Sequence, residues 1–110
     1  MIYSSITELV GRTPLLEIKG LEGLKARLVV KLELFNPGGS AKDRVALSMI
    51  EDAEASGLLK PGATIIEPTS GNMGIALAAI AAVRGYHCVI VMPEGMSIER
   101  IRTMRAYCAE

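Results

Sequence analysis

Residues 63–92 read ATIIEPTSGNMGIALAAIAAVRGYHCVIVM, and this stretch decides the fold. A β-branched run over 63–67 leads through a loop into an alanine-rich segment, 72–84, which Gly85 closes, and an apolar run follows over 87–92. Continuous apolar strands joined by a helix are typical of a parallel sheet with right-handed connections. The sequence therefore predicts an α/β fold, in the form of a three-layer open parallel sheet with helices on both faces.

Turn and capping signals on either side of this stretch place the other elements. Glycine and proline mark the turns, and a serine with an acidic residue three positions later marks a helix start. The chain stops where a further strand is due after the last helix, so we expect a truncated version of the architecture. The remaining elements are expected as helices over 5–11, 40–57 and from 97 onward, and as strands over 15–18 and 26–32.

The composition excludes several classes of protein. The 12 Lys and Arg residues balance the 12 Asp and Glu residues, and half of the chain is hydrophobic, so neither a disordered tail nor a nucleic-acid binder is expected. The longest apolar run, Ile75–Val83, is much shorter than the roughly 20 residues of a membrane span. No secretion signal opens the sequence. We expect a cytoplasmic protein with no membrane partner.

The cysteines and the histidine do not form a metal site. Cys88 and Cys108 lie too far apart for a CxxC pair and are expected to be free thiols in a reducing compartment. His87 has no carboxylate or cysteine at metal-ligand spacing, and it falls in an expected strand rather than in a catalytic loop. Acid–base chemistry would therefore have to use another residue type.

The first loop that could carry chemistry is Asn36-Pro37-Gly38-Gly39-Ser40-Ala41-Lys42-Asp43-Arg44. Ser40 is expected to cap a helix, which places Lys42 in its first turn, where the helix dipole disfavours a cation. The dipole and partial burial would both favour the neutral amine, which is a nucleophile that can form a Schiff base with an aldehyde. The alternative is an exposed lysine with a solvated charge.

The second loop is Glu67-Pro68-Thr69-Ser70-Gly71-Asn72-Met73-Gly74. It lies between the carboxyl end of an expected strand and the start of a helix, where open α/β sheets bind their ligands. Free backbone N–H groups, two hydroxyls and an amide at the positive end of a helix suit a carboxylate or a phosphate. The alternative is an ordinary turn in which Asn72 caps the helix.

Both loops, in this order and spacing, resemble those of the pyridoxal-phosphate-dependent cysteine synthases (O-acetylserine sulfhydrylases), which have fold type II, the fold of tryptophan synthase β. The resemblance extends over nearly the whole chain. The matching stretches are 6–15, 36–44, 66–76 and 92–110.

The resemblance implies a role for each loop residue. Lys42 would hold pyridoxal 5′-phosphate as a Schiff base and would act as the acid–base group at the substrate α-carbon. Asn72 would hydrogen-bond the ring 3-oxygen of the cofactor. The substrate α-carboxylate would be held by Thr69, Ser70, Gly71 and Asn72, with Met73 beside them. The family reaction is β-replacement, in which O-acetylserine loses acetate and sulfide adds to give L-cysteine.

The resemblance also implies partners and a division of the chain. Residues 1–45 would open the larger domain, and residues 46–110 would form an incomplete smaller βαβα domain. A homodimer is expected, together with a serine acetyltransferase partner. The phosphate-gripping loop of the family is absent from these 110 residues, so the chain by itself is expected to be inactive.

Two features leave the function open at this stage. Met73 stands where the family usually has threonine, and loss of that hydroxyl would weaken carboxylate binding by roughly 1.5–3 kcal/mol. A cystathionine β-synthase has the same fold and chemistry and remains an alternative. So does a catalytically inactive fragment or binding module.

Overall fold

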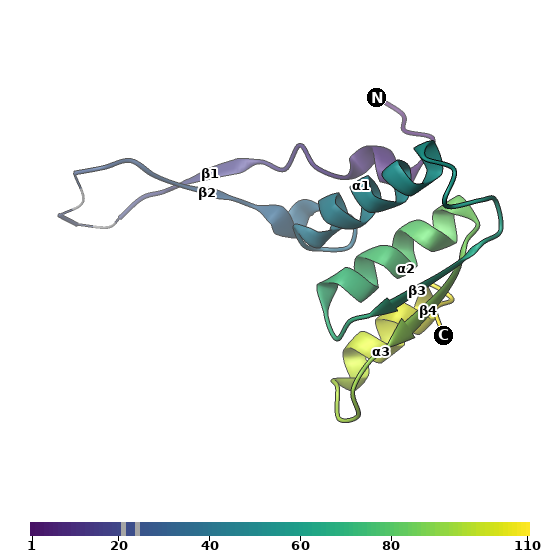
Figure 1. Cartoon of the computed structure of the whole chain (residues 1–110). Helices are drawn as coiled ribbons and strands as arrows, with labels where there is room; N and C mark the ends of the chain where they lie inside the picture. The colour runs from purple at the N-terminus through teal and green to yellow at the C-terminus, as the bar shows by residue number, and fades with distance from the viewer. Residues whose placement is uncertain (21, 24) are drawn as a thin grey trace.

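The computed structural model describes residues 1–20, 22–23 and 25–110. Two sheets of two strands each and three α-helices make up most of the ordered backbone (Figure 1). The elements are η1 (Ile6–Leu9), β1 (Leu15–Ile18), β2 (Leu28–Lys31), η2 (Glu33–Phe35), α1 (Lys42–Ala55), β3 (Thr64–Pro68), α2 (Asn72–Arg84), β4 (His87–Val91) and α3 (Ile98–Ala106), where η denotes a 3₁₀ helix.

The stretch that was expected to decide the fold forms a parallel β–α–β unit. β3 and β4 pair in parallel, with Ile65 opposite Cys88 and Ile66 opposite Val89. α2 connects them and ends at Gly85, whose left-handed backbone (φ 77°) favours glycine. The predicted α/β class and parallel pairing are confirmed.

Small side chains allow α2 to lie close to its neighbours. Ala76, Ala78 and Ala81 are at most 1% exposed, and α2 packs against both parallel strands and against α1 and α3. A helix surface without long side chains permits this close approach. The buried hydrophobic residues are Ala46, Ile50, Ala76, Leu77, Ala78, Ile80, Ala81, Cys88, Met104 and Ala109.

Only one face of the parallel sheet is packed against helices in the described part of the chain. Ile65, Cys88 and Ile90 contact the core, whereas Ile66 and Val91 on the other face are 65% and 54% exposed. The total accessible area is 7481 Å², compared with about 5,900 Å² for a typical folded monomer of this mass. The strands were expected to be buried on both faces, but this chain covers one face.

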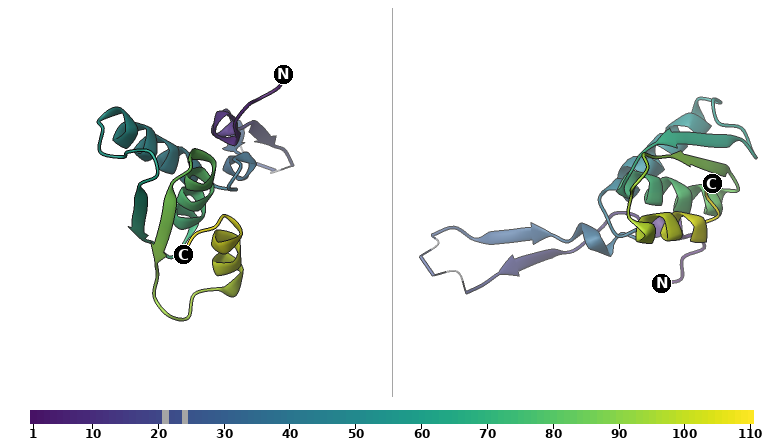
Figure 2. Two further views of the ribbon diagram at one scale, coloured as in Figure 1. Left: turned by 90° about the vertical axis from the view of Figure 1, so that its right-hand side faces the viewer. Right: turned by 90° about the horizontal axis from the view of Figure 1, so that it is seen from below.

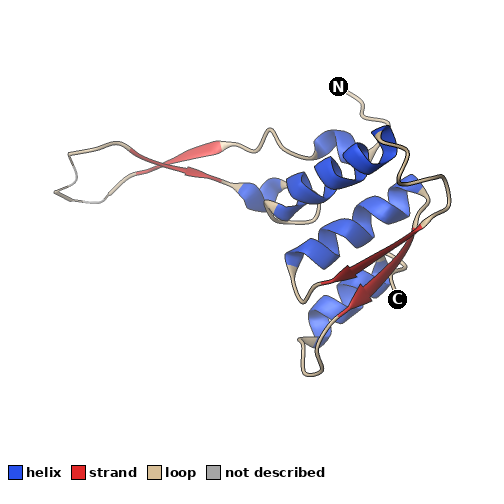
Figure 3. Cartoon of the chain, in the orientation of Figure 1, coloured by secondary structure: helices blue, strands red, loops and turns tan. Residues whose placement is uncertain are grey.

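The first two strands form an antiparallel hairpin rather than part of a parallel sheet. Leu15 pairs with Lys31 and Ile18 with Leu28. A parallel crossover needs a dozen or more residues, and the connection over 19–27 is too short for one. The hairpin projects from the rest of the molecule (Figures 2 and 3). The radius of gyration is consequently 16.7 Å, above the about 13 Å of a compact domain of this length.

The last residue, Glu110, lies along the edge of β4 that β3 does not occupy. The Glu110 N–H donates to the Cys88 carbonyl at 3.0 Å, and the Ile90 N–H donates to the Glu110 carbonyl at 2.7 Å. This is the hydrogen-bond pattern of a parallel pair. It extends the order β3–β4 in the same direction. The division into residues 1–45 and 46–110 would fall inside α1, and it stays a prediction.

Candidate functional site

The two loops singled out from the sequence meet at the same end of the structure. α1 and α2 pack side by side, and their first turns lie together near the carboxyl ends of β3 and β4 (Figures 1 and 2). Gly38 and Asp43 of the first loop line a small hollow together with Ala76 and Ala79 of α2. The packing of α1 against α2 thus places Lys42 and the loop 69–72 on one side of the molecule.

Two adjacent glycines shape the lysine loop for different reasons. Gly39 has a left-handed backbone, with φ at 84°. At Gly38, an added Cβ would lie only 2.5 Å from Oδ1 of Asp43, so a side chain there has no room. The carboxylate of Asp43 instead accepts the Gly38 N–H through Oδ2 at 2.5 Å.

Most of the amides in this loop have an acceptor, whereas the N–H groups of Ser40 and Ala41 have none among the described residues. The Lys42 N–H donates to Oγ of Ser40 at 3.2 Å, and the Asp43 N–H donates to the Ser40 carbonyl. Ser40 was expected to be the helix cap, but Ala41 occupies that position and Ser40 lies one residue earlier. The Ser40 hydroxyl still satisfies one of the N–H groups at the helix start.

Lys42 is the first residue of α1, as expected, and its side chain is exposed. The partial burial expected from the sequence is therefore not supplied by the described residues. Asp43, its neighbour, is only 3% exposed, and burial raises the pKa of its carboxyl. The exposed lysine thus stands beside a buried carboxyl that anchors the loop.

The second loop is tied to the sheet at one end and open at the other. The Thr69 N–H donates to the Val91 carbonyl at 3.0 Å, and the Gly71 N–H donates to Oγ1 of Thr69 at 3.4 Å. Gly71 occupies the position before α2, and Asn72 is the first helical residue rather than the cap. The Asn72 side chain is exposed, so its amide is available to a ligand.

Unpaired donors gather at the open end of this loop. Within the described ranges, the N–H groups of Ser70, Asn72 and Met73 have no protein acceptor. They lie at the positive end of α2, which favours an anion. Thr69 and Ser70 also line a pocket of about 550 Å³ at the carboxyl ends of β3 and β4. These donors and this space fit a small carboxylate.

Met73 packs partly into the protein rather than standing free in the loop. Its side chain is half-buried and contacts the hydrophobic core. At the next residue, Gly74, an added Cβ would lie 2.9 Å from Cγ2 of Thr69 and 3.1 Å from Sδ of Met104. Gly74 therefore allows the Thr69 side chain to approach α2 closely.

Two groups of polar residues near the loops were not predicted from the sequence. Arg100 of α3 donates from Nη1 to the Ser70 carbonyl at 3.1 Å. Glu33, in the unexpected turn η2, accepts hydrogen bonds from Thr13, Asn36 and Arg44. In the second group, Thr13 and Asn36 are buried, and each directly precedes a proline, Pro14 or Pro37. A polar residue before a proline is the sequence feature that could have indicated this group.

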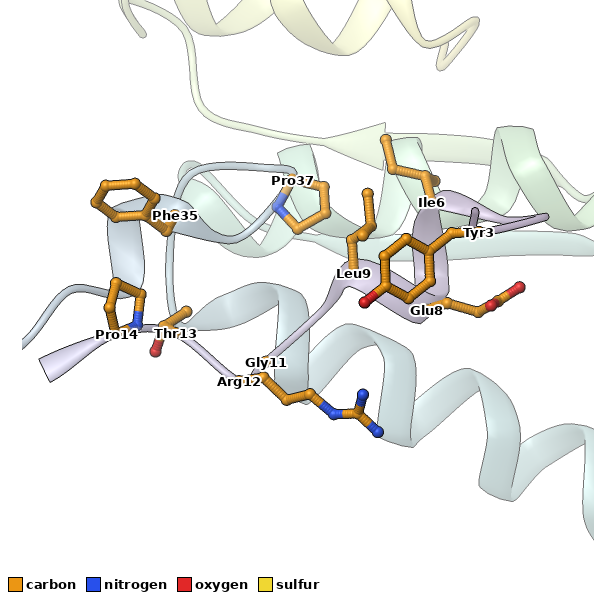
Figure 4. Close-up of a pocket in the computed structure, with 10 residues that line it drawn as sticks. All are labelled: Tyr3, Ile6, Glu8, Leu9, Gly11, Arg12, Thr13, Pro14, Phe35 and Pro37. Carbon is orange, nitrogen blue, oxygen red and sulfur yellow. The ribbon is translucent and has the colours of Figure 1, made fainter. Parts of the chain in front are cut away.

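A separate apolar groove lies along the N-terminal segment (Figure 4). Its volume is about 440 Å³, and neither Lys42 nor any residue of the loop 69–72 lines it. The lining residues are Tyr3, Ile6, Glu8, Leu9, Gly11, Arg12, Thr13, Pro14, Phe35 and Pro37.

Metal-ligating residues do not gather near these loops. Among the residues that the structure describes, no three His, Cys, Asp or Glu side chains are placed to hold a metal ion. None of the helices in the described ranges has the length and apolar character needed to cross a membrane.

The fold and the paired loops define an α/β unit with an exposed lysine at the start of one helix and unpaired N–H groups at the start of its neighbour. Residues 6–110 match the family described as "Pyridoxal-phosphate dependent enzyme". The chain belongs to this family, whose members depend on pyridoxal phosphate. The resemblance inferred from the motifs and the fold type II architecture are thereby confirmed.

Curated relatives and a solved structure agree with this assignment. A cysteine synthase from Flavobacterium sp. is 56% identical over the whole chain, which covers 36% of that protein. Cystathionine beta-synthase from Rattus norvegicus is also 56% identical, over 99% of the chain and 20% of that protein. A crystal structure of an O-ureido-L-serine synthase superposes with a TM-score of 0.96 and 52% identity, over the whole chain and 35% of that structure. The chain thus spans between a fifth and just over a third of the relatives it matches.

Proposed function

We propose that this chain provides the lysine and the carboxylate-binding loop of an enzyme that makes L-cysteine from O-acetylserine and sulfide by β-replacement. The observation that carries this proposal is the presence of an exposed Lys42 at the start of α1 and of three unpaired N–H groups at the start of α2, two helices that pack against each other. A β-replacement enzyme needs both, because the amino-acid substrate must be held by its carboxylate while an amine removes its α-proton.

The loop residues would share the binding of substrate and cofactor. The N–H groups of Ser70 and Asn72 and the hydroxyls of Thr69 and Ser70 would hold the substrate carboxylate, and Gly71 would keep the backbone accessible. Asn72 would donate its amide N–H to the ring 3-oxygen of pyridoxal 5′-phosphate. Bound pyridoxal phosphate supplies an electron sink for the pair of electrons left at the α-carbon.

Lys42 would carry out the proton transfers. Its Nζ would bind the cofactor aldehyde in the resting enzyme, and as the free amine it would take the α-proton of the substrate. The acetate oxygen would then leave from the β-carbon, and sulfide would add there. Lys42 would return the proton to the α-carbon. In this scheme the fixed backbone around Lys42 orients the amine, while the open loop orients the carboxylate.

A cystathionine β-synthase reaction is the second candidate. The chain is as similar to the rat cystathionine beta-synthase as to the Flavobacterium cysteine synthase, at 56% identity to each. In both candidates a group leaves the β-carbon of the amino-acid substrate and a sulfur nucleophile adds there. They differ in this nucleophile, which is sulfide in the first and homocysteine in the second. A catalytically inactive binding module is the third candidate, in which the loops bind ligand without turnover.

Further proposals concern the setting of the enzyme. We infer a homodimer, association with a serine acetyltransferase and a cytoplasmic location, all by analogy with the family. The 110 residues alone are proposed to be inactive, because one face of the parallel sheet is exposed and the chain covers 36% of the cysteine synthase it matches.

A chimaera tests the function. Residues 1–110 would replace the matching segment of the Flavobacterium cysteine synthase, and cysteine and cystathionine would be measured with sulfide or homocysteine as the thiol. We expect O-acetylserine and sulfide to give the highest kcat/KM, and the 110-residue chain alone to give no product. Preference for homocysteine would support the second candidate. A chimaera that binds pyridoxal phosphate but forms neither product would support the third.

A further inference from the structure

A cluster of polar side chains joins three segments of the chain around Glu33. Arg44 donates to the Glu33 carboxylate through two nitrogens, Nε to Oε2 at 2.8 Å and Nη2 to Oε1 at 3.0 Å. Thr13 Oγ1 donates to Oε1 at 2.6 Å, and Asn36 Nδ2 donates to Oε2 at 2.9 Å. These hydrogen bonds hold the pKa of Glu33 at about 2, so its carboxylate is charged at neutral pH.

The cluster also binds the backbone of the N-terminal segment and of η2, which precedes the lysine loop. The Gly11 N–H donates to Oδ1 of Asn36 at 2.7 Å, and Asn36 Nδ2 donates to the Glu33 carbonyl at 3.0 Å. Gly11 has a left-handed backbone, and an added Cβ would lie 2.9 Å from Nη1 of Arg44. The guanidinium therefore packs directly against the N-terminal segment.

Asn36 and Arg44 are the first and last residues of the loop that presents Lys42. Asn36 is 3% exposed and Thr13 is 5% exposed, so the cluster has a buried base. Between the two ends, the amides of Gly38, Gly39, Lys42, Asp43 and Arg44 are all hydrogen-bonded within the loop. The planar guanidinium is suited to this task, because its two parallel hydrogen bonds fix orientation as well as distance.

We propose that Glu33 and Arg44 are positioning residues, which together close the two ends of the lysine loop and fix the direction of the first turn of α1. They do not reach the reacting atoms. They act through the backbone, by fixing the loop from which the exposed Lys42 side chain projects. This inference deepens the proposed function, on which it rests for the role of Lys42.

Hydrogen exchange of the 110-residue chain without cofactor tests the positioning role. Glu33→Gln and Arg44→Gln should each speed exchange of the amides of residues 38–44 at least tenfold, with little change in the second half of α2. Arg44→Lys should give an intermediate effect, because lysine retains the positive charge but cannot form the two parallel hydrogen bonds of the guanidinium. The matched control is Arg84→Gln, which breaks the exposed pair with Glu51 and Glu54 at the far end of α1 and should leave residues 38–44 unchanged.

A second measurement follows Lys42 itself in the chimaera. Pyridoxal phosphate is added, and the Schiff bases that it forms with lysines are reduced by borohydride to stable secondary amines. The labelled lysines are then identified by peptide mass. Arg44→Gln should lower the labelled fraction at Lys42 at least threefold relative to Lys60, and the double variant Glu33→Arg with Arg44→Glu should recover part of it. Arg84→Gln should not change this ratio.

The outcomes separate this inference from the proposed function. Uniform acceleration of exchange over α1 and α2 in the Arg44 variants, including Arg44→Lys, would overturn the positioning role and make the cluster a general stabilising element. An unchanged labelling ratio would also overturn it. If exchange and labelling respond as expected while the chimaera makes no cysteine, the cluster positions Lys42 and the proposed function is wrong.

Discussion

The lysine loop, residues 36–44, and the loop 69–72 lie at the same end of the structure but differ in the share of their N–H groups that the protein binds. In the lysine loop, the N–H groups of Gly38, Gly39, Lys42, Asp43 and Arg44 are bound inside the protein, and those of Ser40 and Ala41 have no acceptor among the described residues. In the loop 69–72, the N–H groups of Ser70 and Asn72 have no acceptor among the described residues. A loop that must aim one side chain is fixed by its own hydrogen bonds, whereas a loop that must bind an anion keeps its donors free.

The largest expected effect comes from the lysine itself. In the chimaera, Lys42→Ala should lower kcat by about 10²- to 10⁴-fold, the usual contribution of a general acid–base group. Alanine is well tolerated in a first helical turn, so the melting temperature should stay close to that of the parent. Lys60→Ala, at an exposed turn, is the matched control and should retain full turnover. Activity above about a tenth of the parent, a margin of about 1.4 kcal/mol, would disprove the assignment of Lys42.

A pair of glycine substitutions compares the rigidity of the two loops. Gly38→Ala places a Cβ 2.5 Å from Oδ1 of Asp43 and should destabilise the chain by about 1–3 kcal/mol. Gly71→Ala meets only Nη1 of Arg100, at 3.9 Å, and should cost much less. Denaturant unfolding of both variants measures the difference. Equal losses at the two positions would show that the lysine loop is no more tightly packed than the other.

Met73→Thr examines the open loop in the chimaera. A threonine hydroxyl beside the free N–H groups should lower KM for O-acetylserine by about tenfold, with a smaller change in the dependence on sulfide, because a hydrogen bond to a charged group contributes about 1.5–3 kcal/mol. Met73→Val is the matched control, since valine has the shape of threonine without the hydroxyl. Because Met73 contacts the core, both variants should melt at a lower temperature.

The two Met73 variants also separate binding from packing. A KM that is the same in the threonine and valine variants, with equally lowered melting temperatures, would make Met73 a packing residue and remove it from the substrate site.

The smallest expected effect is a change in acid stability. Glu33 has a folded-state pKa of about 2 against an ordinary value of 4.5, so its stabilisation is complete above pH 4.5 and is lost as the pH falls towards 2. Asp43 acts in the opposite sense, because its raised pKa means that stability falls as the pH rises above 3.8 and the buried carboxyl ionises. Glu33→Gln should therefore flatten the decline of the melting temperature between pH 4.5 and 2. Parallel curves for parent and variant would contradict this.

Much of the fold was predictable because the local sequence patterns agree with the way in which the strands pair in the structure. The β-branched and apolar runs around α2 became β3 and β4, and Gly85 ends α2 as its position indicated. The capping box of Ser5 and Glu8 is also present. The placement of Lys42 at a helix start follows from the glycines and proline that precede it.

The remaining features depend on contacts between distant segments, which periodicity does not record. The alternation over 26–32 indicated a strand but not its antiparallel partner, and η2 interrupts the pattern at Glu33. The cluster of Glu33, Thr13 and Arg44 joins residues up to 31 positions apart. Ser40 and Asn72, the expected caps, each lie one residue from the observed cap, a shift that side-chain preference alone does not resolve.

The buried alanines of α2 limit which substitutions the chain can tolerate. Ala76, Ala78 and Ala81 have almost no exposed surface. A larger side chain at any of them would overpack the core and lower the free energy of unfolding by about 1–3 kcal/mol. The projecting hairpin has no such limit, since Leu15, Leu28 and Val29 are at least 39% exposed in this chain. A scan of all single substitutions would accordingly show a block of intolerant positions along one helix. We expect the tolerated substitutions to lie mainly in the hairpin and on the exposed surface, and few of them in the buried face of α2.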